Sequence, residues 1–145
     1  MAKFDFEIPA DFIKQLNNAA AIDEFGGKMI DEAMPIVERN LKKELEKHRR
    51  TGNMINSVKI KKASKNKYGW FGVVRPTGLS KTYKSVKGEI VKRKVPVRNM
   101  EILAHLEYGT KHQSPKPVLT KVIRDSESAV IRKMQEVFDR EVLNK

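Results

Sequence analysis

Apolar residues recur at helical spacing through the first third of the chain. Pro9 stands where the first turn of a helix tolerates proline, and the apolar residues after it predict a short helix over 9–18. We expect Gly26-Gly27 to interrupt the chain before a long amphipathic helix over about 28–48. Pro35 should bend this helix rather than end it, because the apolar stripe continues beyond it. The stripe consists of Ile30, Ala33, Met34, Val37, Leu41 and Leu45.

The apolar period changes to two after Thr51-Gly52-Asn53, which we expect to end the long helix and turn the chain. Alternating residues predict strands over about 57–63 and 68–75, joined by a turn at 65–67, and a further strand over 89–97. The intervening residues 77–88 have the composition of a basic, flexible surface loop.

Helical spacing returns in the last third of the chain. Asn99 is placed to cap a short helix, and Gly109 is placed to end it. Two prolines over 114–117 predict an extended link, and a long helix is expected over about 118–142. The order of elements predicts a single α+β domain over 1–145, with residues 1–27 as an N-terminal arm and short helix. Its expected architecture is a small antiparallel sheet of three to four strands packed against a long N-terminal helix and a long C-terminal helix.

Composition narrows the class of protein. The 145 residues suffice for one domain with a buried core. Cysteine is absent, which excludes disulfides, thiolate metal ligands and a cysteine nucleophile. No apolar run approaches the roughly 20 residues of a membrane helix, and the first residues lack the apolar region of a signal peptide. We therefore expect a protein that works or assembles in a reducing cytoplasm without a membrane partner.

The net charge of +12 is unevenly distributed. Residues 1–41 carry four basic and eight acidic side chains, whereas residues 42–98 carry eighteen basic and three acidic ones. A basic surface of this kind suggests a polyanion or an acidic protein surface as partner.

One stretch of the basic region is a candidate contact for DNA or for a partner protein. It contains Lys81, Lys84, Lys87, Lys92, Arg93 and Lys94. Because the chain has neither a recognition helix nor a series of stacking aromatics, we expect contact with the nucleic-acid backbone at most. For Lys59, Lys61 and Lys62, a role in solubility and in protecting strand edges is an equal alternative.

Signals for catalysis are weak. Gly26-Gly27-Lys28 lacks the leading glycine and the following serine or threonine of a phosphate-binding loop. Glu101, His105 and His112 could form a weak metal site, but a third helical ligand and a His-x-x-x-His pair are both missing. A cryptic hydrolase that uses His105 and Glu101 is a further alternative. No serine lies in a nucleophile elbow. We expect no enzymatic activity, no cofactor and no metal.

Three short segments, by their order and spacing, resemble those of a known protein family. The first is Arg50-Thr51-Gly52-Asn53-Met54-Ile55-Asn56-Ser57-Val58, the second is Ala104-His105-Leu106-Glu107-Tyr108-Gly109-Thr110, and the third covers residues 115–122. Together they resemble the tail-completion, or head-to-tail joining, family of long-tailed bacteriophages and prophages, over a region from about Met29 to the C-terminus. The third segment departs from the family pattern, because Val118, Thr120 and Lys121 replace an aromatic residue, an arginine and a proline. The residues that carry the resemblance are Thr51, Gly52, Ser57, Leu106, Glu107, Tyr108, Gly109 and Thr110.

The resemblance implies a non-enzymatic virion protein of the neck or tail, assembled in the host cytoplasm. It implies a homo-oligomer, a hexameric ring in the particle whose isolated subunits can be monomers. Its partners would be a head connector or adaptor and a tail terminator or tail tube protein, with non-specific passing contact to duplex DNA. The alternative is a small basic protein that binds nucleic acid without sequence specificity.

Roles for the residues of the first two segments follow from their chemistry and from the resemblance. Gly52 is expected to use a positive φ at the exit from the helix. The segment 106–110 is expected to hold the short helix against the sheet, with Tyr108 presenting a ring that has a polar tip. Glu107 is a candidate to pair with a basic residue of a strand.

Overall fold

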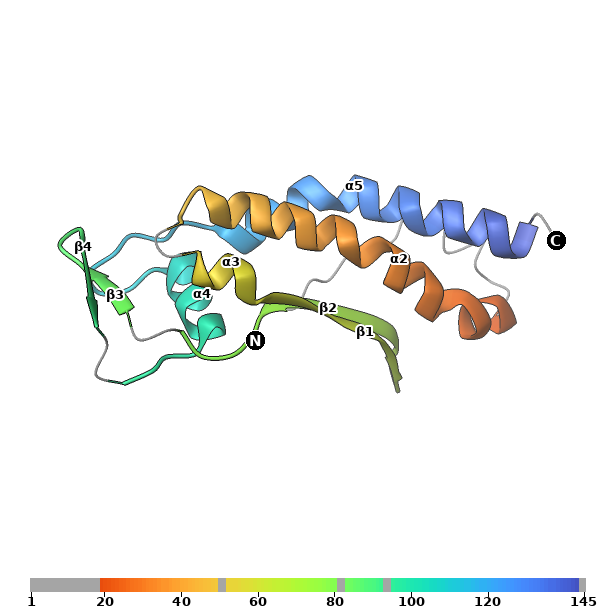
Figure 1. Cartoon of the computed structure of the whole chain (residues 1–145). Helices are drawn as coiled ribbons and strands as arrows, with labels where there is room; N and C mark the ends of the chain where they lie inside the picture. Colours follow the sequence, from red (N-terminus) through yellow and green to blue (C-terminus); the bar gives the residue numbers. More distant parts are fainter. Residues whose placement is uncertain (1–18, 50–51, 81–82, 93–94, 144–145) are drawn as a thin grey trace.

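The computed structural model describes residues 19–49, 52–80, 83–92 and 95–143, with only the backbone described at 19–22, 83–85 and 90. Its fold is α+β, as the sequence pattern predicts. Helix α2 (Ala19–Glu46) and helix α5 (Val118–Phe138) run side by side along the molecule. A ribbon of β1 (Val58–Asn66) and β2 (Gly69–Pro76) packs on the other side of α2 (Figure 1).

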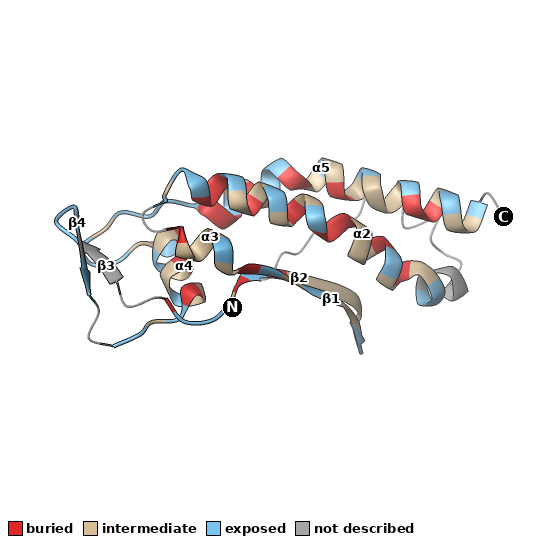
Figure 2. Ribbon diagram, viewed as in Figure 1, coloured by how far each residue is buried: buried red, intermediate tan, exposed pale blue. Residues whose placement is uncertain are grey.

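The core lies between these three layers. Buried residues concentrate along the facing sides of α2 and α5 (Figure 2). Burying such apolar side chains stabilises the fold by about 1.5–3 kcal/mol each. The predicted stripe of α2 is confirmed, since all its members after Ile30 are buried. The main cluster comprises Ala33, Met34, Val37, Leu41, Leu45, Val58, Val74, Leu103, Val118, Leu119, Val122 and Val130.

Helix α2 begins earlier than the sequence predicts. It starts at Ala19 and continues through Gly26 and Gly27, so the interruption predicted there is wrong and residues 19–27 belong to α2. The short helix predicted over 9–18 lies outside the described residues. The Trp70 ring packs directly on these glycines: a Cβ atom added at Gly26 would lie 2.5 Å from Trp70 Cδ1. The glycines therefore let β2 approach α2 closely, and this packing outweighs their low helix propensity. Pro35 lies inside the helix, which continues beyond it as predicted.

The β1–β2 ribbon is antiparallel and close to its predicted bounds, although its turn falls at Lys67-Tyr68 rather than at 65–67. Its register shifts between Lys61 and Ser64, and within this bulge the Ala63 N–H donates to Asp31 Oδ1 of α2 at 2.7 Å. Because side chains alternate along a strand, one face of the ribbon meets α2 and the other faces away from it.

A second, separate hairpin consists of β3 (Tyr83–Val86) and β4 (Glu89–Lys92). The prediction of a loop over 77–88 is therefore wrong at 83–86, and the strand predicted over 89–97 ends at Lys92. Lys87 and Gly88 both have positive φ, as in the tight turns that suit a hairpin. The sequence shows Lys-Gly here instead of the usual Asn-Gly or Asp-Gly, so the turn signal was weak.

Three short helical elements complete the fold. Helix α3 (Asn53–Ser57) follows Gly52, and α4 (Asn99–Tyr108) precedes α5 and ends at Gly109 as predicted. A π-helix, η1 (Asp139–Leu143), continues α5. Across the described part of the chain, no helix combines the length and hydrophobicity needed to span a membrane.

Candidate functional site

The three segments that carry the resemblance meet at one end of the molecule. We call this region the junction: it comprises α3, the residues that follow β2, α4 and the first turn of α5 (Figure 1). Thr51 lies outside the described residues.

The first part of the junction is the exit from α3. Gly52 has φ of 74°, as predicted, and precedes α3 directly. The Ser57 carbonyl accepts hydrogen bonds from both the Thr77 N–H at 2.9 Å and the Thr77 hydroxyl at 2.8 Å. The Ser57 hydroxyl itself donates to the Met54 carbonyl at 2.7 Å. Ser57 thus ties α3 to the end of β2.

Asn99 forms the centre of the junction. Its side chain is 2% exposed, donates to the Thr77 carbonyl at 2.8 Å and accepts from Asn53 Nδ2 at 3.3 Å. The prediction that Asn99 caps α4 is wrong, because the cap position is Arg98, whose side chain makes no capping hydrogen bond. Asn99 is a bridge between α3, β2 and α4, and a cap and a bridge look alike in sequence.

Glu107 lies at the other end of α4 and serves α5. Its carboxylate is 9% exposed and accepts from the Leu119 N–H at 2.7 Å, the Thr120 N–H at 3.3 Å and the Thr120 hydroxyl at 2.6 Å. The first N–H groups of a helix have no partner within it, and a carboxylate there also suits the helix dipole. Pro117, the cap position of α5, supplies no side-chain bond. Glu107 therefore caps α5 in place of the predicted pairing with a basic strand residue.

The residues around Glu107 close the link between α4 and α5. The Lys116 N–H donates to the Leu106 carbonyl at 2.7 Å, and Thr110 bonds to Gln113 in a short antiparallel bridge. Gly109 has φ of 75°, and a Cβ atom there would lie 2.9 Å from the Gln113 carbonyl oxygen. The segment 106–110 thus ties α4 chiefly to α5, with Leu106 packed against the core. Tyr108 is 73% exposed beside this link.

The junction also anchors a projecting segment of residues 78–98, which we call the arm. The Asn99 N–H donates to the Gly78 carbonyl at 3.0 Å, and the Ser80 N–H donates to the Val97 carbonyl at 2.6 Å. The arm carries the β3–β4 hairpin beyond α4 at the end of the molecule (Figure 1). Large apolar side chains are exposed along it, namely Leu79, Val86, Val91 and Val95.

The six basic residues predicted as a DNA or partner contact fall on the arm. Lys87 at the hairpin turn and Lys92 at the end of β4 are exposed. Lys84 is placed in β3 by its backbone, and Lys81, Arg93 and Lys94 lie outside the described residues. The sequence did not predict that the apolar residues beside these cations are exposed. An irregular basic stretch has no hydrophobic periodicity from which exposure could be inferred.

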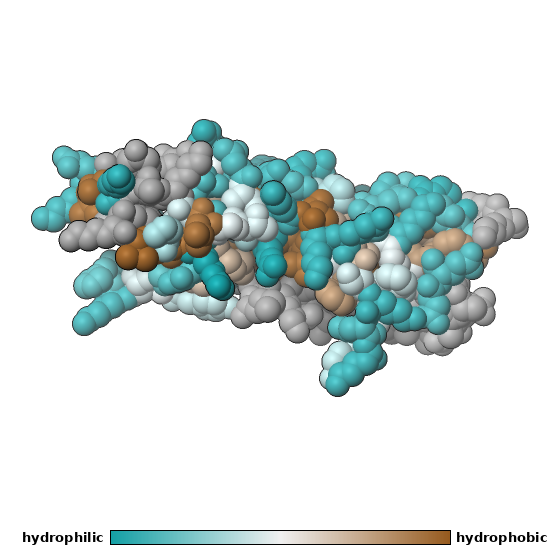
Figure 3. Space-filling view, turned by 60° about the horizontal axis from the view of Figure 1, so that its bottom comes forward, coloured by the Kyte–Doolittle hydropathy of each residue, from teal (hydrophilic) through white to brown (hydrophobic). Residues whose placement is uncertain are grey.

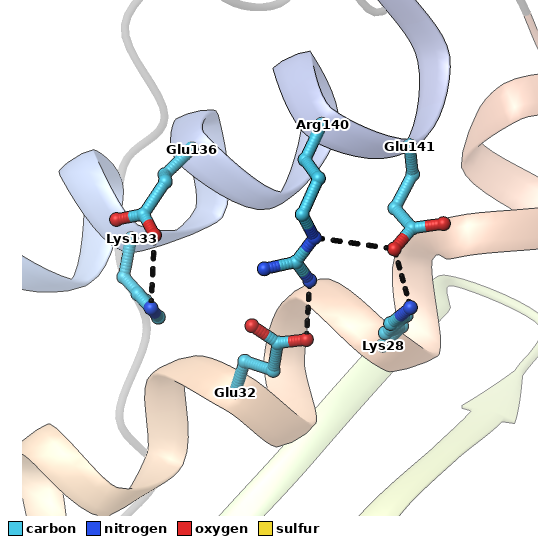
Figure 4. Close-up of polar contacts among 6 residues, drawn as sticks. All are labelled: Lys28, Glu32, Lys133, Glu136, Arg140 and Glu141. Atoms are coloured by element: carbon cyan, nitrogen blue, oxygen red, sulfur yellow. Dashed lines mark hydrogen bonds and ion pairs between the residues drawn. The ribbon is translucent and has the colours of Figure 1, made fainter. Parts of the chain in front are cut away.

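The opposite end of the molecule is held by ion pairs between α2 and η1 (Figure 4). Arg140 Nη2 lies 2.6 Å from Glu32, and Glu141 contacts both Lys28 and Arg140. The hydrogen bond from Lys28 lowers the pKa of Glu141, and the bond to Glu32 raises the pKa of Arg140. Carboxylates of α2 thus neutralise cations elsewhere in the same chain.

The glutamate and two histidines weighed for catalysis are all exposed and form no metal-binding group within the described part of the chain. Glu101 and His105 are exposed on α4, and His112 is exposed in the turn after it. Over the residues that the structure describes, no group of three or more histidines and carboxylates is placed to hold a metal ion. Gly26-Gly27-Lys28 is internal to α2 rather than in a loop before a helix.

Comparison with known proteins identifies no relative: no family model, no curated protein and no solved structure matches the chain.

Proposed function

We propose that this chain is a structural virion protein of the tail-completion type, which joins or completes a phage or prophage tail through protein contacts. The arm carries the proposal, because it exposes apolar side chains that a single chain leaves uncovered. Exposed apolar groups gathered on one projecting segment are typical of a surface that a protein partner covers.

The junction links this surface to the resemblance. All three segments that resemble the family contribute to the junction, and the junction holds both ends of the arm through Gly78 and Asn99. Only the first segment bonds directly to residues beside the arm, through Asn53 to Asn99 and Ser57 to Thr77. The second and third segments join α4 to α5.

Ring assembly is part of this proposal. If the arm of one subunit docks elsewhere on the next subunit, the contact is head-to-tail, and such contacts form a ring when the rotation between subunits closes. The proposed ring is a hexamer at the head–tail interface, between a head connector or adaptor and a tail terminator or tail tube protein. The proposed location is the virion, after assembly in the host cytoplasm, and the proposed role is non-enzymatic.

A matched pair of leucines tests the arm. Leu79 on the arm is 58% exposed and Leu143 at the opposite end is 63% exposed. Each is replaced by aspartate in the full chain, and each variant is supplied to a phage or prophage from which the gene has been deleted. We expect Leu79→Asp to lower the yield of joined particles at least about tenfold, the factor for roughly 1.4 kcal/mol of lost contact, and Leu143→Asp to restore it.

Equal restoration by the two variants would refute the role of the arm. Folding of both is checked by circular dichroism, and because both side chains are exposed we expect their thermal unfolding to match the wild type within about 0.5 kcal/mol.

The alternative function is that of a small basic protein that binds nucleic acid without sequence specificity. It is favoured by cations of the β1–β2 ribbon, of which Lys59, Lys61 and Arg75 are exposed. Tight duplex binding by a protein that leaves particle assembly unchanged on deletion would favour this alternative.

A further inference from the structure

The face of the β1–β2 ribbon that points away from α2 is a separate basic surface. We call it the outer face. Val58, Ile60 and Val74 belong to the side that packs with α2, so the alternate positions make up the outer face. Lys59 lies opposite Arg75, Lys61 opposite Val73, and Ser64 opposite Phe71.

The cations of this face form no ion pairs within the described part of the chain. Among the described residues, no ion pair includes Lys59, Lys61 or Arg75, whereas Lys65 on the α2 side of the ribbon pairs with Asp23. Lys59 and Arg75 are also direct cross-strand neighbours, and like charges in that relation destabilise a sheet. An anion bound at this face would remove the repulsion.

The outer face is long and accessible. Its strands span eight to nine residues, about 25 Å at about 3.3 Å per residue. The described helices lie above the ribbon or beyond its Val58–Pro76 end (Figure 1). Figure 3 brings this side forward and shows long hydrophilic side chains projecting from it, with smaller apolar patches between them.

The exposed chemistry of this face favours a polyanion over an acidic protein. The centre of a protein interface is usually apolar. The large apolar residues of the outer face, Val73 and Phe71, are half-buried, so they expose only part of their surface to a partner. Lys62 in the bulge and Lys67 at the turn are exposed and add to the positive charge along the ribbon. Duplex DNA presents about one phosphate per 1.7 Å of its axis, so a surface of this length faces many phosphates.

We infer that the outer face of the β1–β2 ribbon binds the phosphate backbone of duplex DNA without reading its sequence. Lys59, Lys61 and Arg75 make the contacts. This assigns the DNA contact to the ribbon, separate from the arm that the sequence suggested for it. The inference does not rest on the proposed function, because a virion ring and a free nucleic-acid-binding protein could both use such a face.

The test measures binding of the full chain to a short duplex of mixed sequence over a salt series from about 50 to 200 mM. The ribbon variant carries Lys59→Gln, Lys61→Gln and Arg75→Gln together. Each phosphate contact contributes about 0.9 to the slope of log affinity against log salt. We expect the ribbon variant to lower the magnitude of that slope by about 2.7 and to weaken binding at least about tenfold at the lowest salt.

The control variant carries Lys43→Gln, Lys111→Gln and Lys116→Gln, which change the net charge equally at exposed positions away from the ribbon. We expect it to keep most of the wild-type slope. Equal losses in the two variants, an unchanged slope in the ribbon variant, or no binding by the wild type would each overturn the inference.

A polyglutamate competitor separates DNA from an acidic protein. If polyglutamate displaced the wild type as well as duplex does at equal charge, the face would suit an acidic protein and the inference would fail. Folding of the ribbon variant is checked by the fluorescence of Trp70, the only tryptophan, which lies on the α2 side of the ribbon. Because the substitution removes a like-charge pair, the variant should be at least as stable as the wild type.

Discussion

At the scale of single residues, one polar side chain of the junction accepts hydrogen bonds from N–H groups that have no partner within their own helix. It is that of Glu107, whose largely buried carboxylate accepts three hydrogen bonds from the first turn of α5. Removing an acceptor of this kind leaves buried donors without partners, which costs more than the loss of an exposed bond.

We predict that Glu107→Ala lowers the free energy of unfolding by about 2 kcal/mol, the cost of a helix cap that is also charged and largely buried. Glu107→Gln should lose less, since the amide oxygen still accepts. Urea unfolding followed by circular dichroism measures both. Glu101→Ala, an exposed glutamate on the same helix, is the control and should change stability by about 0.5 kcal/mol or less. Equal losses for Glu107→Ala and Glu101→Ala would contradict the capping role.

A second residue-scale prediction concerns acid stability. The hydrogen bond from Lys47, with a further one from Lys121 of α5, lowers the pKa of Glu44 from 4.5. A lowered folded pKa means that the stabilisation is fully present above pH 4.5 and is lost as the pH falls through the folded value. The free energy of unfolding, measured as the pH falls through this acid range, should therefore decline more steeply for the wild type than for Glu44→Gln. Parallel declines would show that Glu44 contributes nothing to the acid response.

At the scale of elements, close packing overrides local propensity where α2 meets β2. Alanine is better than glycine in a helix by about 1 kcal/mol, which alone predicts that Gly26→Ala stabilises α2. The Trp70 ring stands 2.5 Å from the position of the added methyl group, so we predict instead a loss of about 1–3 kcal/mol in the free energy of unfolding.

The partner substitution Trp70→Leu isolates the cause of this loss. In the Trp70→Leu background, Gly26→Ala should be neutral or stabilising, because the clash has gone and the helix propensity remains. Thermal unfolding by circular dichroism completes the cycle of the two variants and their combination. If Gly26→Ala stabilised the protein with Trp70 in place, the packing argument would be wrong.

The elements also show what a sequence pattern can predict. The stripe of α2, the long α5 and the β1–β2 ribbon were predictable because each repeats one period over many residues. The start of α2 was not, since Gly26-Gly27 reads as a break until Trp70, some forty residues away, is seen to pack on it. Of the second hairpin, β4 lies within the predicted strand over 89–97, but β3 was missed because it has only four residues and the turn after it lacks asparagine or aspartate.

The candidate site was predictable in its membership but not in its contacts. Glu107 and Gly109 were singled out by the resemblance, yet the partners of Glu107 are backbone N–H groups twelve and thirteen residues later, which have no side-chain signature. Asn99 was identified for a different task, because a cap and a buried bridge require the same side chain. Leu79 and Val95 were missed because exposure depends on the whole fold.

At the scale of the whole molecule, the two ends differ in chemistry. One end is closed by ion pairs between α2 and η1, and the other carries the junction and an arm with exposed apolar side chains. Within the described part of the acidic first third, Asp23, Glu32 and Glu38 form ion pairs with cations of the same chain. The proposed contact with other subunits rests on the exposed apolar side chains of the arm.

The central claim is that the chain completes or joins the tail of a phage particle. The most direct measurement is electron microscopy of lysates from a phage or prophage in which this gene has been deleted, with and without the gene supplied on a plasmid. The account predicts heads and tails that remain separate after deletion and are joined again when the gene is supplied. Joined, infectious particles in the absence of the gene would contradict it.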